Sequence, residues 1–219
     1  MTFHRLMRKT VERIRPLLPV RGRVIEFGNQ RYTSDRDFLT TQAFYESLGF
    51  EYLALDVNEN MGAKIVDLNV TGHDLKADLV TNNGTSEHIF NQAAVFQNAH
   101  NMSLSLMLHI LPFTPWLNHG FYNYNPILFR DLAAANDYDI VFAAIGNRIG
   151  EYSELGSEGF IEKRPVDLER KVLSLMSGGE VSNIFVFRKT NAKEFRMPFQ
   201  GKYKKDIQSE DLSEKYVVG

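Results

Sequence analysis

The chain has 219 residues, of which 43% are hydrophobic, so it can bury one sizeable core, and we expect a single domain. Its formal net charge of −2 gives no strong field that would recruit nucleic acid or a membrane surface. The absence of cysteine excludes disulfides, thiolate metal sites and cysteine nucleophiles.

The first half of the chain alternates between strand and helix patterns. Short apolar runs that end in polar residues are typical of buried strands, and apolar residues spaced three or four apart are typical of helices. The predicted elements are a helix over residues 3–18, a strand over 24–27, a helix over 35–48 with Ser34 as its N-cap, strands over 52–57 and 63–66 joined by a short connection, and a strand over 77–82.

The second half continues the alternation and then changes character. The predicted elements are a helix over residues 91–101, a strand over 103–111 that Pro112 and Pro115 end, a helix from Pro126 to Ala135 with Asn125 as its cap, a strand over 138–145, a helix over 166–176 in an otherwise irregular region, and a strand over 182–188. We expect residues 1–189 to form the domain and the charged residues 190–219 to be a flexible arm or an oligomer contact.

This order of elements predicts an α/β fold. Seven strands alternating with helices favour a doubly wound, mostly parallel sheet with helices on both faces. Ligands of such sheets bind at the carboxyl ends of the strands. Polar and aromatic residues gather at these ends, in the segments 26–30, Asp56, Asp67-Leu68, 82–88 and 109–124.

The residues at the strand ends also carry a family resemblance. Ile25-Glu26-Phe27-Gly28, Leu55-Asp56, Val66-Asp67-Leu68 and the segment 78–89, which contains Ser86-Glu87-His88-Ile89, together resemble class I S-adenosylmethionine-dependent methyltransferases of the small-molecule branch. The resemblance covers roughly residues 20–145. The segment 119–126 is similar to a stretch in bacterial members of the family, some of which act on glycans.

The resemblance implies S-adenosylmethionine as cofactor and assigns roles to single residues. Gly28 would approach the methionine part, Glu26 would order that turn or meet the amino group, and Asp56 would accept hydrogen bonds from both ribose hydroxyls. Asp67 would accept from the adenine amino group, beside the Leu68 backbone. The full set implied for the cofactor is Glu26, Phe27, Gly28, Asn29, Gln30, Asp56, Val57, Asp67, Leu68, Asn82, Asn83 and Gly84.

One position departs from the family pattern. Gln30 stands where the family usually has a second glycine. The turn must therefore open wider or use the glutamine side chain. This departure motivates the alternative interpretation, a methyltransferase-like binding or scaffold protein without turnover.

Three histidines are candidates for a catalytic base, because they fall at strand ends or just beyond and imidazole can take a proton near neutral pH. The order of preference is His119, His88 and His109. A metal site built from these three histidines is an alternative that we do not predict, because no tight ligand spacing supports it. The predicted substrate contacts are Trp116, His119, Tyr122 and Tyr124. The aromatic loop that holds them has two alternatives, a small hydrophobic core or a dimer surface.

The sequence thus predicts methyl transfer from S-adenosylmethionine to an oxygen or nitrogen of a small-molecule or glycan-type acceptor. A dinucleotide dehydrogenase is less well supported because no Gly-x-Gly-x-x-Gly follows the first strand, and a triad hydrolase because no Gly-x-Ser-x-Gly occurs. A nucleic-acid methyltransferase fits the near-neutral charge poorly. With no signal-peptide pattern or bilayer-length apolar run, we expect a cytoplasmic protein without membrane partners, and leave a homo-oligomer open.

Overall fold

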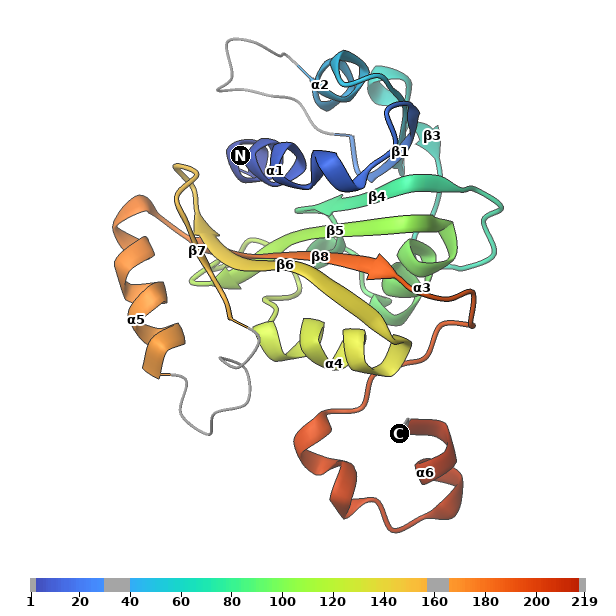
Figure 1. Cartoon of the computed structure of the whole chain (residues 1–219), viewed down its shortest axis with the longest axis vertical. Helices are drawn as coiled ribbons and strands as arrows, with labels where there is room; N and C mark the ends of the chain where they lie inside the picture. Colours follow the sequence, from blue (N-terminus) through green and yellow to red (C-terminus); the bar gives the residue numbers. More distant parts are fainter. Residues whose placement is uncertain (1–2, 30–39, 157–165, 217–219) are drawn as a thin grey trace.

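A computed structural model describes residues 3–29, 40–156 and 166–216, with side chains from residue 5 onward. These residues form one eight-stranded sheet with the order β3-β2-β1-β4-β5-β8-β6-β7 (Figure 1). The strands are β1 (Gly22–Phe27), β2 (Phe50–Asp56), β3 (Lys64–Ile65), β4 (Ala77–Asn83), β5 (Ser103–Thr114), β6 (Tyr138–Asn147), β7 (Tyr152–Glu154) and β8 (Val181–Lys189).

Most of the sheet is parallel, as the alternating pattern predicts. Strands β3, β2, β1, β4 and β5 pair in parallel. Strand β8 runs antiparallel between β5 and β6, so β6 points the same way as β5. The prediction of seven strands is wrong by one: β7 forms an antiparallel hairpin with β6 at the edge. Its three residues were too few to show a strand period among the glycines of that region.

Helices cover both faces of the sheet, which confirms the doubly wound prediction (Figure 1). One apolar cluster joins α1 and α2 to one face, and a second joins α3 and α4 to the other. A smaller cluster packs α5 against the end of β6. The helices are α1 (Phe3–Ile14), α2 (Thr41–Ser47), α3 (Gln92–Met102), α4 (Pro126–Asn136), α5 (Val166–Leu175) and α6 (Glu210–Tyr216).

Strand β5 shows why the centre of this sheet is almost continuously apolar. Leu106, Leu108 and Ile110 face the α1–α2 side, whereas Met107 and Leu111 face the α3–α4 side. Successive strand residues point to opposite faces, so a strand covered on both needs apolar residues throughout. Burying both sets stabilises the fold and places the end of β5 at the sheet's centre.

Pro112 does not end β5, contrary to the prediction. The strand continues to Thr114, and Pro112 pairs with Ser182 of β8 next to an irregularity in register. The last residue of β5 that pairs with β4 is Ile110. Beyond it β5 has a neighbour on one side only, and a proline without an N–H donor is tolerated at such an edge.

Two predicted caps differ in the structure. The N-cap of α2 is Thr40, whose hydroxyl accepts from the Ala43 amide at 3.1 Å; the predicted cap, Ser34, lies outside the described residues. Asn125 occupies the N-cap position of α4 with Pro126 after it, but its side chain makes no capping hydrogen bond. The expected short link between β2 and β3 is confirmed as a single 3-10 turn, Asn60–Gly62.

The segment after β8 begins with specific contacts to the domain. The Lys193 carbonyl lies 2.8 Å from His100 Nε2, and the Asn136 side chain bonds the Arg196 backbone in both directions. Phe195 packs against the α3–α4 core. Further on, the 3-10 helix Gly201–Asp206 and α6 lie apart from the sheet, beyond α4 (Figure 1). No helix in the described part of the chain is both long and apolar enough to cross a membrane.

Candidate functional site

The turn after β1 brings backbone to the carboxyl edge of the sheet. Gly28 has φ +76°, and its amide donates to the Leu55 carbonyl at 2.7 Å. A Cβ on Gly28 would lie 2.4 Å from the Thr85 Oγ1, whose hydroxyl donates to the Phe27 carbonyl at 2.6 Å. Glycine is therefore required here for both its conformation and its size.

The carboxylate of Asp56, at the end of β2, is held against this turn. Its Oδ2 accepts from the Asn29 amide at 3.0 Å, and its Oδ1 accepts from the Val57 amide at 2.7 Å and the Asn58 side chain at 3.1 Å. A carboxylate offers about four acceptor positions. One is therefore left for a ligand, and a second becomes available when the exposed Asn58 amide turns away.

The chain after β3 supplies a second carboxylate. Asp67 is exposed, and its Oδ1 accepts from the Asn69 backbone at 2.8 Å and from the Asn69 side chain at 3.0 Å. These two bonds hold the pKa of Asp67 below its usual range. Asp67 is thus ionised at neutral pH and presents acceptors to the edge of the sheet. Leu68, next to it, is buried.

A pocket of about 370 Å³ connects these elements with the turn after β4. We call it the strand-end pocket. Of the predicted cofactor residues it brings together Gly28, Asn29, Asp56, Val57, Asp67, Leu68 and Gly84. Five further lining residues were not predicted to contact the cofactor: Leu55, Val66, Asn69, Thr85 and Ile89. His88, predicted as a catalytic base, also lines this pocket. Thr85 and Ile89 lie within the segment 78–89 that carries the resemblance, so their proximity to the site could have been inferred from it.

Four other predicted cofactor residues lie beneath this pocket, not in its lining: Glu26, Phe27, Asn82 and Asn83, all almost fully buried. Glu26 Oε2 accepts from the hydroxyls of Thr41 and Tyr52, and its Oε1 accepts from Asn83 at 3.3 Å. Asn82 Oδ1 accepts from the Ser86 amide at 3.2 Å. These contacts brace the turns that form the pocket floor. Gln30 lies outside the described residues.

Glu87, His88 and His119 form a cluster beside the strand-end pocket. His119 Nε2 lies 3.4 Å and His88 Nε2 3.9 Å from Glu87 Oε1, and the candidate ligand atoms of all three residues lie within 4.8 Å of one another. The loop 115–125 is fastened here, because the Phe121 amide donates to the Glu87 carbonyl at 2.8 Å. Gly120 allows the close approach, since a Cβ there would lie 2.9 Å from Glu87 Cγ.

Burial sets the charge of this cluster. The side chain of Glu87 has no exposed surface, and burial raises its pKa to about 8, partly offset by its own backbone amide. Burial, and secondarily the proximity of His119, lowers the pKa of His88. Both oxygens of Glu87 and the Nε2 of His119 are buried without a hydrogen-bond partner among the described residues. At pH 7 the cluster therefore holds a protonated acid and a neutral His88.

The structure does not bring His109 to this cluster. Its side chain is 1% exposed in the α3–α4 core, surrounded by the rings of Phe96, Phe129 and Phe187. Burial lowers its pKa to about 3, so it stays neutral. The group of possible metal ligands in the structure therefore differs from the three histidines considered in the sequence, because Glu87 takes the place of His109. A strand-end position alone could not reveal which face of β5 a side chain occupies.

The predicted substrate residues are divided between two further pockets. His119 lines a pocket of about 320 Å³, which we call the loop pocket, together with His88, Asn118, Gly120 and Phe121. Tyr122 and Tyr124 line an aromatic pocket of about 330 Å³ between α3 and α4. Trp116 donates to the Val181 carbonyl at 2.9 Å and lies with its ring 4.8 Å from that of His119.

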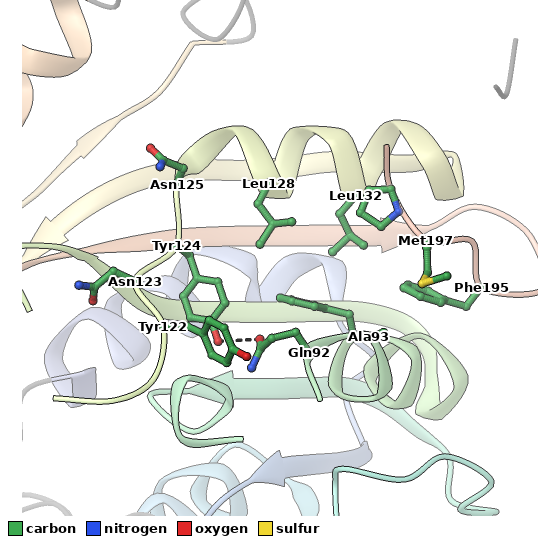
Figure 2. A pocket seen from close by; sticks show the side chains of 12 residues that line it. Gln92, Ala93, Tyr122, Asn123, Tyr124, Asn125, Leu128, Leu132, Phe195 and Met197 are labelled. Atoms are coloured by element: carbon green, nitrogen blue, oxygen red, sulfur yellow. Dashed lines mark hydrogen bonds between the residues drawn. The ribbon is translucent and has the colours of Figure 1, made fainter. Parts of the chain in front are cut away.

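The aromatic pocket is mostly apolar. Figure 2 shows Leu128 and Leu132 projecting from α4 toward Tyr124, with Phe195 and Met197 at its far end. The Tyr124 hydroxyl donates to Gln92 Oε1 at 2.8 Å, so Tyr124 serves as a wall between α3 and α4. Tyr124 is only 4% exposed. It therefore fits the alternative prediction, in which the loop forms a small hydrophobic core, better than it fits a substrate contact.

No protein-family model matches the sequence, and no curated protein matches it significantly. Solved structures do match the fold. Burkholderia thailandensis 1,6-didemethyltoxoflavin-N1-methyltransferase, solved with its substrate and S-adenosylhomocysteine, is 13% identical with a TM-score of 0.54 over 85% of this chain and 78% of that chain.

Two further structures agree. Magnesium protoporphyrin IX methyltransferase from Synechocystis PCC 6803, with bound S-adenosylhomocysteine, is 11% identical with a TM-score of 0.53 over 86% and 84% of the two chains. A SAM-dependent methyltransferase from Archaeoglobus fulgidus is 15% identical with a TM-score of 0.50 over 84% and 93%. The predicted resemblance is thus confirmed at the level of fold: the chain has the fold of S-adenosylmethionine-dependent methyltransferases.

Proposed function

We propose that this chain binds S-adenosylmethionine in the strand-end pocket and transfers its methyl group to an oxygen or nitrogen of a small molecule. One observation carries the proposal: a single pocket of about 370 Å³ brings together Gly28, Asp56, Asp67 and Gly84 from four different strand ends. Its size is in the range of pockets that hold small-molecule ligands, roughly 300–1,000 Å³. The fold shared with solved methyltransferases supports the same assignment.

The residues of the pocket fit the parts of this cofactor. The free acceptor positions of Asp56 suit ribose hydroxyls, and ionised Asp67 suits the adenine amino group. Val57, 77% exposed, and Ile89 offer apolar surface to the flat base. Gly28 and Gly84, both with positive φ, let backbone approach the methionine part.

The acceptor is proposed to enter through the loop pocket. His88 lines both this pocket and the strand-end pocket, so it forms a shared wall. Phe90 and Phe121, 75% and 68% exposed, add flat apolar surface nearby, which suits a ring-shaped acceptor, aromatic or sugar. When bound, the cofactor supplies a methyl group that is already activated, so alignment of the acceptor is the main task of the protein. His88 and His119 are proposed to activate the acceptor.

The proposal is tested by calorimetry with S-adenosylhomocysteine and S-adenosylmethionine. We expect binding of both, and a loss of about 10- to 100-fold in affinity for Asp56→Ala, because a hydrogen bond to a charged group contributes about 1.5–3 kcal/mol. Asp139→Ala is the matched control: its carboxylate is equally part of a strand but exposed on β6, away from the pocket, and should leave affinity unchanged.

Two outcomes would contradict the proposal. The first is that neither compound binds, and the second is that Asp56→Ala binds as tightly as the parent chain. Binding without turnover over a panel of phenols, sugars and amines would favour the scaffold alternative. That panel is scored by the release of S-adenosylhomocysteine, which does not depend on knowing the acceptor.

A further inference from the structure

The buried carboxyl of Glu87 is the feature that the proposed methyl transfer leaves unexplained. Its side chain is fully buried in the 3-10 turn Ser86–His88, and apart from its own backbone amide no hydrogen-bond donor of the described residues reaches either oxygen. Burying a polar group without a partner is unfavourable, because the group gives up its hydrogen bonds to water and gains none in return. The Nε2 of His119, 3.4 Å away, is likewise buried and without a hydrogen-bond partner. The Glu87 carboxyl and the His119 imidazole thus face each other without hydrogen-bond partners among the other described residues, which indicates that a bound ligand belongs between them.

We propose that Glu87, His88 and His119 bind a divalent first-row transition metal ion between the strand-end pocket and the loop pocket. The Glu87 carboxyl would release its proton to solvent as the ion binds. Two imidazoles and one carboxylate then form a mixed nitrogen and oxygen donor set, which suits zinc, iron, cobalt or manganese. Magnesium and calcium prefer oxygen ligands alone, so they fit this set poorly.

The distances agree with such a site. A tetrahedral ion with bonds of about 2.0–2.1 Å holds its ligand atoms about 3.3 Å apart. The two separations from Glu87 Oε1 are 3.4 Å to His119 and 3.9 Å to His88, and no pair in the group exceeds 4.8 Å. The His88 side chain is 48% exposed, so it can rotate the remaining distance, whereas Glu87 and His119 are held by packing.

The ion is also inferred to act on the methyl acceptor, and this part of the inference rests on the proposed methyl transfer. Three protein ligands leave at least one coordination position open, as in catalytic metal sites. His88 and His119 both line the loop pocket, so an acceptor held there would lie next to the ion. When bound, the ion would lower the pKa of an acceptor hydroxyl held there, so that the hydroxyl would lose its proton to solvent and its oxygen would be nucleophilic next to the strand-end pocket. The favoured acceptor is therefore an alcohol or phenol rather than an amine.

The test is calorimetry on tag-free protein that has been stripped with EDTA, titrated separately with zinc, manganese and magnesium chloride. We expect one zinc ion per chain and no measurable magnesium binding. Glu87→Gln and His119→Gln keep the side-chain size but remove a ligand. Loss of outer-shell partners alone lowers metal affinity about 10- to 100-fold, so each variant should lose at least about 100-fold. His73→Gln is the control, because His73 lies outside the cluster and bonds the Asp67 carbonyl.

A second measurement guards against misfolding of the variants. Cobalt bound to the parent chain should give visible absorption bands that are absent in Glu87→Gln, while circular dichroism and the melting temperature show that the variant is folded. Failure of zinc to bind, or equal zinc affinity in folded Glu87→Gln, would overturn the site. Binding of S-adenosylhomocysteine is measured in parallel. If S-adenosylhomocysteine binds and zinc does not, only the metal site is contradicted. If zinc binds and S-adenosylhomocysteine does not, only the cofactor assignment is contradicted.

Discussion

At the scale of single residues, Gly28 is under two constraints that can be separated. Its φ of +76° disfavours any side chain, and the Thr85 hydroxyl occupies the place of a Cβ. We expect Gly28→Ala to lower the free energy of unfolding by at least about 1–2 kcal/mol from the backbone alone. Gly62→Ala is the matched control, since Gly62 has φ +79° with nothing within 4 Å of its Cβ position.

The difference between these two variants isolates the Thr85 contact. Urea unfolding of both, and of the double variant Gly28→Ala/Thr85→Ala, measures it. The double variant should recover stability toward the level of Gly62→Ala. Equal destabilisation by Gly28→Ala and Gly62→Ala would show that the Thr85 side chain moves aside without lowering the free energy of unfolding.

His109 predicts a pH dependence of stability. Burial lowers its pKa to about 3 in the folded chain, below the ordinary value of 6.5. Between these values the unfolded chain binds a proton that the folded chain does not, so stability is lost as pH falls from 6.5 toward 3. Between pH 7.5 and pH 5, this one group should contribute a loss of about 2 kcal/mol.

The measurement is urea unfolding at both pH values. His109→Gln cannot titrate, so its loss over the same interval should be smaller than that of the parent chain by about this amount. An identical pH slope in His109→Gln and the parent chain would contradict the assignment.

At the scale of elements, the loop 115–125 is positioned by its contact with the 3-10 turn Ser86–His88. A Cβ on Gly120 would lie 2.8 Å from the Glu87 carbonyl oxygen, and the Phe121 amide bonds that same oxygen. Gly120→Ala should therefore displace the loop and cost about 1–3 kcal/mol, as overpacking does. It should also weaken zinc binding, because His119 moves with the loop.

The melting temperature and the fluorescence of Trp116, the only tryptophan, report this displacement. Its ring lies 4.8 Å from that of His119, so its emission should change when the loop moves. Gly156→Ala serves as the control, since no atom of the described residues lies within 4 Å of its Cβ position. Unchanged fluorescence and melting temperature in Gly120→Ala would show that the loop is not set by this contact.

The elements were largely predictable from local sequence, but the contacts between them were not. Apolar runs located the strands, and apolar residues spaced three or four apart located α3, because these signals lie within one segment. The meeting of Glu87 with His119 joins residues far apart in the chain and depends on how β5 continues through Pro112. Likewise, whether His109 faced a pocket or the core depended on the register of β5, which periodicity does not fix when both faces are apolar.

At the scale of the whole molecule, the chain after β8 first contacts the domain and then leaves it. His100 Nδ1 lies 2.6 Å from the Tyr138 hydroxyl and its Nε2 lies 2.8 Å from the Lys193 carbonyl. The Nε2–H therefore donates to Lys193, and Nδ1 accepts from Tyr138. These bonds and the paired hydrogen bonds between Asn136 and Arg196 hold the segment after β8 over the apolar ends of α3 and α4.

The predicted domain boundary at residue 189 can be tested against these contacts. A chain that ends at residue 190 loses these hydrogen bonds, the exposed Lys193–Asp137 ion pair and the packing of Phe195, which we expect to lower the free energy of unfolding by roughly 3–5 kcal/mol. A chain that ends at residue 201 keeps these contacts and loses only the last 3-10 turn and α6, so its stability should stay near that of the full chain. Thermal and urea unfolding of the three chains distinguish the cases: equal stability at 190 and 201 would place the boundary at 189, whereas a loss confined to 190 makes residues 191–199 part of the folded unit that holds the aromatic pocket closed.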